Sequence, residues 1–210
     1  MWGPGIAALV CLYVFRKNHI RTVSFWGGNK MRSIAFYWLP ILALVIPGLQ
    51  EKQSGINPHL MPVIYGIIGF ISIFGEELGW RGFLQDALTP IKSYKKFFLI
   101  AFLWELWHFR SNLYFNHAYR QEAIMILYVI VLSFIIGFAV ERTRSLWVAV
   151  TLHTWADIGV EFDSVATYWV LGFAIPFWAF MIYYWPTSKK QASQANISAT
   201  IQKSRETVAN

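Results

Sequence analysis

Long apolar runs alternate with short charged segments along almost the whole chain. Four of these runs contain no Asp, Glu, Lys or Arg over at least 18 residues, which is enough for a helix to cross the hydrocarbon core of a bilayer. They are Ser33–Gln50, Gln53–Gly75, Ala123–Val140 and Ser164–Ser188. Each run is therefore predicted to form a membrane-spanning helix.

Three further apolar segments are shorter or carry polar side chains: Met1–Phe15, Phe97–Phe109 and Leu146–Val160. Together with the four runs they predict an all-α fold, a polytopic membrane bundle of about seven transmembrane helices within residues 1–186. The remaining residues, 187–210, are polar and rich in Ser, Gln and Lys. A segment with so little apolar surface cannot bury a core, so this tail is predicted to be disordered and cytoplasmic.

The Lys and Arg residues are divided unevenly between the two sides of such a bundle. With the N-terminus outside, 15 of the 18 fall in segments on the inside and 3 in outside loops. This asymmetry follows the positive-inside rule, and an even number of helices would break it. The pattern predicts an integral membrane protein with its N-terminus outside and its C-terminus inside. Tyr183, Tyr184 and Trp185 near the inner end fit either an interfacial aromatic belt or ordinary packing.

Composition agrees with a membrane protein and narrows its partners. Apolar residues make up 56% of the chain and charged residues 14%, against about 25% charged in a typical soluble domain. The net charge of +7 would suggest a nucleic-acid partner in a soluble protein, but here basic inside loops account for it. We therefore expect the lipid bilayer, and no nucleic acid, as a partner. Cys11 is the only cysteine, which excludes an intrachain disulfide and a metal site built from cysteines.

Two adjacent carboxyl groups, Glu76 and Glu77, end the second charge-free run. Ionisable groups within a spanning helix are costly and by default mark a functional site. If the helix continues, Glu77 and Arg81 lie four residues apart on one face and can pair, whereas Glu76 points about 100° away. Gly75 and Gly79 form a face of small residues that lets another helix approach closely. Taken alone, this stretch also fits a helix that leaves the membrane with its charges among the lipid headgroups.

Two other apolar segments carry ionisable side chains. Glu105 and His108 are three residues apart, and His153 and Asp157 are four apart, so each pair shares one helix face. A lone His on an apolar helix is more often a structural hydrogen-bonding residue than a catalyst. Groups of this kind on three helices, however, must either contact one another inside the bundle or face water.

The depths of these groups are compatible with a single layer. If the third helix runs on to Leu88, Glu76 lies about 18 Å from its inner end, at 1.5 Å per residue. His108 and His153 lie about 16 Å and about 10 Å from the inner starts of their helices. The sequence therefore predicts that carboxyl and imidazole groups of the third, fourth and sixth helices meet in one polar cavity.

Three short motifs lie in order on these three helices. They are Glu76-Glu77-x-x-x-Arg81, Trp104-x-x-x-His108 and His153-x-x-x-Asp157. Over roughly residues 34–160 the chain thereby resembles the CPBP family of intramembrane proteases. That family contains the eukaryotic CAAX prenyl endopeptidases and bacterial relatives linked to bacteriocin processing or self-immunity. The family usually has Phe where this chain has Trp104, and we expect this difference to affect packing only. The role of Glu105, which is outside the motifs, stays open.

The resemblance implies an intramembrane endopeptidase that hydrolyses a peptide bond of a membrane-associated peptide or lipidated protein, in a bacterial plasma membrane. Peptide hydrolysis needs an activated water, a stabilised oxyanion and a proton for the leaving amine. Glu76 is the expected general base. Arg81 is expected to keep Glu77 ionised and to orient it, and the two adjacent carboxyl groups should titrate as a coupled pair.

The histidines are expected to complete the site. His108 would share the water with Glu76, either directly or as a metal ligand, and His153 and Asp157 would hold the substrate carbonyl or its oxyanion. There is no His-Glu-x-x-His motif, but His108 and His153 with one Glu would suit a catalytic Zn²⁺. A metal-free reaction would use the same residues, so both alternatives stay open.

Two other classes of function make different demands on the sequence. A proton-coupled transporter with buried Glu and His would be expected to show an internal repeat, and the three motifs do not recur. A non-catalytic scaffold or immunity protein would be expected to lack Glu76, His108 or His153, and all three are present. The sequence does not specify the oligomeric state or the substrate.

Overall fold

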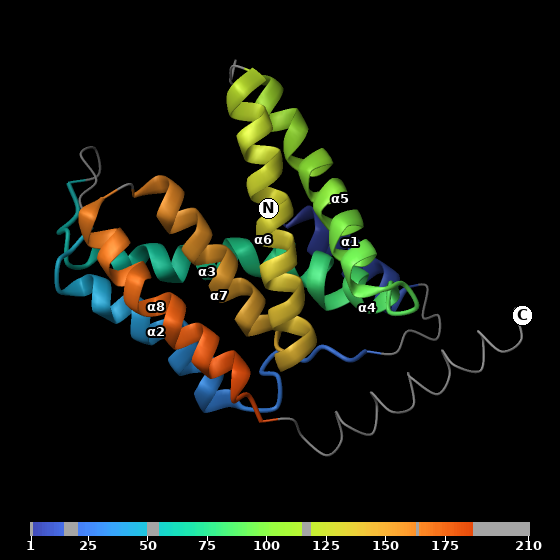
Figure 1. Ribbon diagram of the computed structural model, residues 1–210, viewed down its shortest axis with the longest axis horizontal. Helices are drawn as coiled ribbons and strands as arrows, with labels where there is room; N and C mark the ends of the chain where they lie inside the picture. Colours follow the sequence, from blue (N-terminus) through green and yellow to red (C-terminus); the bar gives the residue numbers. More distant parts are fainter. Residues whose placement is uncertain (1, 15–20, 50–54, 115–118, 163, 187–210) are drawn as a thin grey trace, which may run out of the picture.

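Apolar segments all along the chain become helices in the computed structural model (Figure 1). The structure describes residues 2–14, 21–49, 55–114, 119–162 and 164–186, with the side chains of 109–122 excepted. Over these residues it has no strand beyond one isolated bridge, between Ser24 and Ser145. The predicted disordered tail lies outside the described residues. The elements are α1 (Gly3–Tyr13), α2 (Lys30–Val45), α3 (Met61–Gly79), η1 (Trp80–Leu84), α4 (Gln85–Ala87), α5 (Ser93–Tyr114), α6 (Tyr119–Thr143), α7 (Leu146–Glu161) and α8 (Val165–Tyr183).

The all-α prediction is confirmed for the described residues, whereas seven spans are not. Three helices there are long and apolar enough to cross a membrane: Met61–Ala87, Ala123–Thr143 and Val165–Tyr183. With 11 residues, α1 extends about 16 Å at 1.5 Å per residue, and the 16 residues of α2 and α7 extend about 24 Å. A hydrocarbon core is about 30 Å thick, so these three helices are short for a straight crossing.

The charge-free runs also overestimate helix length. The run Ser33–Gln50 stops being α-helical after Val45, and Gly48 follows with a φ of +76°. The next helix begins only at Met61, after Gly55 with a φ of +63°. Glycines adopt this left-handed region at little cost, so they form the turns that a charge count cannot detect.

The helix with the two carboxyl groups continues well past them, as the depth estimate assumed. It runs from Met61 through Ala87 and includes a five-residue π-helical turn, η1, at Trp80–Leu84. A π-turn adds one residue to the hydrogen-bonded ring, and such turns are frequent at functional sites. Arg81 lies within this turn and is completely buried.

Helix α1 packs against α3 through small residues. A Cβ atom added to Gly79 would lie 2.5 Å from the backbone carbon of Pro4, and one added to Gly75 would lie 2.7 Å from the ring of Trp2. Real Cβ atoms do not approach other atoms this closely. The predicted small-residue face of α3 therefore brings another helix close, and that helix is α1.

We expect Gly79→Ala to destabilise the fold by about 1–3 kcal/mol, because the new methyl group must push the α1 backbone away. Gly172→Ala on α8 is the matched control, since a Cβ there has no atom within 4 Å among the described residues. The control should unfold at or slightly above the wild-type temperature. Thermal unfolding in detergent measures both, and an unchanged midpoint for Gly79→Ala would contradict the close contact.

The remaining helices form two pairs around α3 and α7. Helices α5 and α6 lie side by side and project beyond the rest of the bundle, while α2 and α8 lie together at its other end (Figure 1). Helix α7 packs against both α3 and α6, and eleven of its sixteen residues are buried. This central position explains why most of α7 is buried, and it brings His153 towards α3 and α5.

The segment before α2 packs against the turn before α7 and against Trp185 after α8. Ser24 accepts from the backbone N–H of Leu146 and donates to the carbonyl of Arg144, at 2.9 Å each. Trp26 stacks on Trp147 with ring centroids 4.5 Å apart. Trp185 is 2% exposed and donates its indole N–H to the carbonyl of Gly27. Of the three aromatic residues before the tail, Trp185 is therefore a packing residue.

Candidate active site

The two carboxyl groups of α3 are buried and face different partners. Glu76 is 1% exposed and Glu77 is fully buried. One helical step rotates them by about 100°, so they point to different sides of α3. Buried carboxylates require partners, because leaving either one unpaired away from water is costly.

Glu77 is paired with two basic side chains. Its Oε1 atom accepts from Nη1 of Arg81 at 2.8 Å and lies 2.7 Å from Nδ1 of His153. Arg81 is fully buried, and its guanidinium carbon lies 4.3 Å from the centroid of the Trp104 ring. The predicted pairing of Glu77 with Arg81 is present, and His153 joins it from α7. Glu77 thus links η1 to α7 through a buried ionic network.

Glu76 faces α5 instead. Its Oε2 atom accepts from the indole Nε1–H of Trp104 at 3.2 Å, and Nε2 of His108 lies 3.9 Å from the same oxygen. Nδ1 of His108 lies 2.9 Å from the backbone carbonyl oxygen of Trp104, one helical turn earlier. The His108 side chain is 34% exposed, so this edge of the site is open, whereas Glu76 is enclosed.

His153 connects the buried network to Asp157. Nε2 of His153 lies 3.8 Å from Oδ1 of Asp157, and the Asp157 side chain is 38% exposed. The ring of His153 meets that of Trp104 edge to face, with centroids 4.8 Å apart. The six ionisable residues expected at the site are thus brought together, with Trp104 packed among them.

Sequence reasoning missed the contribution of Trp104. The expectation that Trp104 changes packing alone is wrong, since its N–H hydrogen bonds to Glu76, and Phe cannot donate such a bond. The signal was present in the spacing. Trp104 and His108 are four residues apart, so the indole lies on the same helix face as the imidazole.

Glu105, which the motifs do not include, is also on α5. It lines a groove of about 250 Å³ between α5 and α6. The other residues of this groove are apolar: Phe98, Ala101, Phe102, Leu106, Ile126 and Ile130. Nothing in this position assigns chemistry to Glu105.

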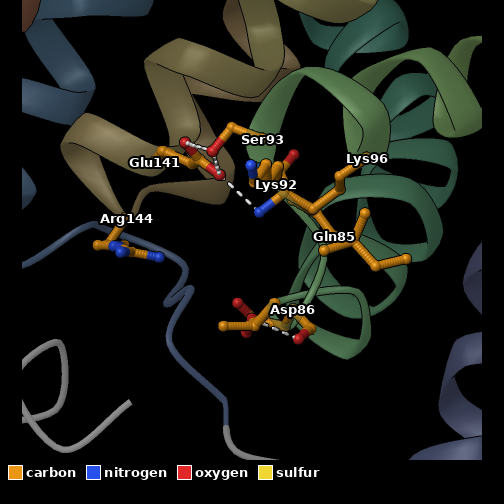
Figure 2. A pocket seen from close by; sticks show the side chains of 9 residues that line it. Gln85, Asp86, Lys92, Ser93, Lys96, Glu141 and Arg144 are labelled. Atoms are coloured by element: carbon orange, nitrogen blue, oxygen red, sulfur yellow. Dashed lines mark hydrogen bonds and ion pairs between the residues drawn. The ribbon is translucent and has the colours of Figure 1, made fainter. Parts of the chain in front are cut away.

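A second cavity, of about 430 Å³, lies where α4, α5 and α6 meet, and its lining includes Lys92, Lys96 and Arg144 (Figure 2). Glu141 there is held by Nζ of Lys96 at 2.5 Å and by the hydroxyl of Ser93. Asp86 accepts from the backbone N–H and the hydroxyl of Thr22, which ties the segment before α2 to α4. The residues lining this cavity include none of the six residues above, so we interpret these contacts as structural.

The placement of the described His, Cys, Asp and Glu side chains bears on the expected zinc site. Within the described part of the chain, no three His, Cys, Asp or Glu side chains converge so as to hold a metal ion. Nδ1 of His153 is engaged by Glu77, and the Nε2 atoms of His108 and His153 face different carboxyl groups. The expected set of two histidines and one carboxylate is therefore not assembled in this arrangement.

Comparison with known proteins adds to this geometry. Residues 58–159, which contain all three motifs, match the family described as type II CAAX prenyl endopeptidase Rce1-like. The chain is also similar to CAAX prenyl protease 2 of Methanococcus maripaludis, with 22% identity over 142 residues. This match covers 58% of the chain and 51% of the relative, so the chain spans about half the relative's length. No solved structure matches significantly. These matches and the three motifs support the resemblance of the chain to the CPBP family, which includes the type II CAAX prenyl endopeptidases.

Proposed function

We propose that this chain is an intramembrane endopeptidase that hydrolyses a peptide bond of a membrane-associated protein or peptide with a water activated by Glu76. One observation carries the proposal: the buried Glu76 carboxyl has the Trp104 N–H 3.2 Å and the His108 Nε2 3.9 Å from the same oxygen. A carboxylate fixed beside an imidazole in an enclosed site is suited to general base catalysis.

The hydrogen bond to Trp104 indicates how His108 presents its ring. A carbonyl oxygen only accepts, so Nδ1 of His108 carries the hydrogen in the bond to the Trp104 carbonyl. In the neutral ring, Nε2 then has a lone pair directed towards Glu76. Two acceptors 3.9 Å apart cannot hydrogen bond to each other, but one water can donate a hydrogen to each. Such a water would be held by both residues with its own lone pairs free to attack.

The reaction then needs one proton carrier. As the water oxygen bonds to the substrate carbonyl carbon, Glu76 takes its proton and the carbonyl oxygen becomes an oxyanion. Glu76 then returns the proton to the amine nitrogen as the carbon–nitrogen bond breaks. Glu76 ends as a carboxylate, the new carboxyl group leaves with one product, and the amine leaves with the other.

His153 is suited to the oxyanion. Its Nδ1 is held by Glu77, which would stabilise a positive charge on the ring and fix its orientation. The Nε2 side faces Asp157 at 3.8 Å, which is too long for a direct hydrogen bond and leaves Nε2 able to donate to a substrate oxygen. We assign Asp157 the task of orienting the substrate, because a carboxylate beside an oxyanion cannot stabilise it.

The relatives suggest which substrates to try. One relative carries the name CAAX prenyl protease 2. We therefore propose, as the first candidate substrate, a peptide that is lipidated near its carboxyl terminus. The uneven distribution of Lys and Arg supports an orientation with the N-terminus outside. In the plasma membrane, the chain would act on substrates that are already anchored to the bilayer.

The test is cleavage by the purified full chain in detergent or vesicles. Peptides that share one sequence, with and without a prenyl group on a cysteine near the carboxyl terminus, are incubated with the protein. Mass spectrometry then locates the cut. We expect a single new carboxyl terminus in the prenylated peptide, and the absence of any cut across a panel of such peptides would count against the proposal.

Metal dependence is measured in the same assay. The mechanism above does not use a metal ion in any step. We therefore expect the cleavage activity to be unchanged after treatment with a chelator that removes Zn²⁺. Metal analysis of the treated protein checks that the Zn²⁺ has been removed. Loss of activity with chelator, restored by added Zn²⁺, would instead support the zinc alternative with His108 and His153 as ligands.

A further inference from the structure

One residue contacts both parts of the proposed site. Trp104 is 2% exposed and lies between the Glu76 side and the Glu77 side. Its indole N–H meets Glu76, and its ring face lies under the guanidinium of Arg81. The ring also packs against His153 edge to face. A large side chain in this position can fix several groups at once.

The indole N–H restricts the Glu76 carboxyl. The last torsion of a Glu side chain is broad, so an unconstrained carboxyl samples many orientations. Trp104 donates to Oε2, and this is the same oxygen that faces Nε2 of His108. Oε2 is the oxygen that would receive the proton from water. The hydrogen bond therefore keeps this oxygen directed towards the imidazole. A nitrogen that only donates cannot take this proton itself.

The backbone of the same residue orients the second partner. The carbonyl oxygen of Trp104 lies 2.9 Å from Nδ1 of His108 and fixes which nitrogen of that ring carries hydrogen. Side chain and backbone of Trp104 thus set the directions of the two groups that share the water. Any residue at position 104 provides the carbonyl, but only a donor side chain of this reach provides the bond to Glu76.

We propose that Trp104 is a positioning residue that aligns the Glu76 carboxyl with His108 through its indole N–H. The proposal rests on the proposed function, because alignment matters only if Glu76 activates water. Misplacement of a reacting group by about 1 Å costs on the order of a hundredfold in rate. Losing the N–H should therefore lower the rate of the chemical step and leave the affinity for substrate nearly unchanged.

The first experiment compares Trp104→Phe with Trp178→Phe. Phe keeps an aromatic ring over Arg81 and against His153 but has no N–H. Trp178 is 5% exposed and donates to the carbonyl of Phe36 at 2.9 Å, away from the site. Its replacement controls for the general cost of losing a buried indole hydrogen bond. We expect Trp104→Phe to lower kcat by roughly 10- to 100-fold with KM changed less than twofold. Trp178→Phe should keep the wild-type kcat, although it loses a similar amount of thermal stability.

A kcat of Trp104→Phe within twofold of the wild type would overturn the proposal. An equal fall in kcat for both variants would overturn it as well, since the effect would then follow stability alone.

The second experiment does not depend on activity. The indole N–H resonance of Trp104, assigned by its disappearance in Trp104→Phe, is followed in Glu76→Gln. Replacing a charged acceptor by a neutral amide should weaken the hydrogen bond and shift this resonance upfield, while the Trp178 resonance stays in place. If no peptide is cut but the resonance shifts, the proposed function fails and the contact stands. An unshifted Trp104 resonance would refute the contact itself.

Discussion

Glu76→Gln should abolish peptide cleavage and leave the fold intact. The amide has the size of the carboxyl group, and its oxygen still accepts from the indole N–H of Trp104, so packing and the hydrogen bond are kept. What is lost is the capacity to take a proton from water. A general base contributes about 10²- to 10⁴-fold, and we expect the cleavage rate to fall at least by about 10³-fold. The rate is measured on the peptide that the wild type cuts, with thermal unfolding of both proteins recorded alongside.

Two further variants make this result specific. Glu105→Gln neutralises another carboxyl group on an apolar helix, in the groove between α5 and α6, and should keep the wild-type rate. Glu76→Asp keeps the acid but withdraws it by one methylene, about 1.5 Å, and should cost on the order of a hundredfold. Full activity in Glu76→Gln would remove Glu76 from the reaction. A large loss in Glu105→Gln would show that the assay responds to charge in the membrane generally.

Much of the site was predictable because helical spacing is rigid. Glu77 and Arg81 are four positions apart, and so are His153 and Asp157, which puts each pair on one helix face whatever the rest of the fold does. The cost of isolated charges among apolar residues then requires the helices carrying them to meet. The contact of Glu77 with both Arg81 and His153 is the outcome of these two rules. The catalytic roles of the residues go beyond these rules and stay predictions.

The parts that were not predictable depend on contacts between distant segments. Nothing in the sequence around Trp26 and Gly27 indicates that this loop is packed against Trp147 and Trp185. Helix α1 likewise carries no charged residue that would tie it to the site, and its place beside α3 follows from the fit of glycines. A count of charges also cannot locate the turns at Gly48 and Gly55, which shorten two predicted spans. Shape complementarity of this kind is decided by the whole fold.

Glu77→Gln should destabilise the protein far more than Glu76→Gln does. Arg81 is completely buried, and Nη1 of Arg81 donates to Oε1 of Glu77 at 2.8 Å. Removing one partner of a buried ion pair leaves an uncompensated charge, which costs about 3–5 kcal/mol. The Glu77 oxygen also serves His153, so the link between η1 and α7 weakens at the same time. Unfolding by denaturant in detergent micelles measures this loss directly, and a loss below about 1 kcal/mol would contradict the buried pair.

Removing both charges distinguishes an ion pair from simple packing. Arg81→Met keeps much of the apolar stem of Arg81 and its contact with Trp104, and it removes the charge that Glu77→Gln leaves unpaired. The double variant Glu77→Gln/Arg81→Met should therefore be more stable than Glu77→Gln alone, because replacing a whole buried pair by neutral groups is often close to neutral. Its activity should stay low, since the neutral amide at position 77 no longer stabilises a positive charge on the His153 ring. If the two substitutions instead add up in free energy, Glu77 and Arg81 are not coupled, and the network that orients His153 would need another explanation.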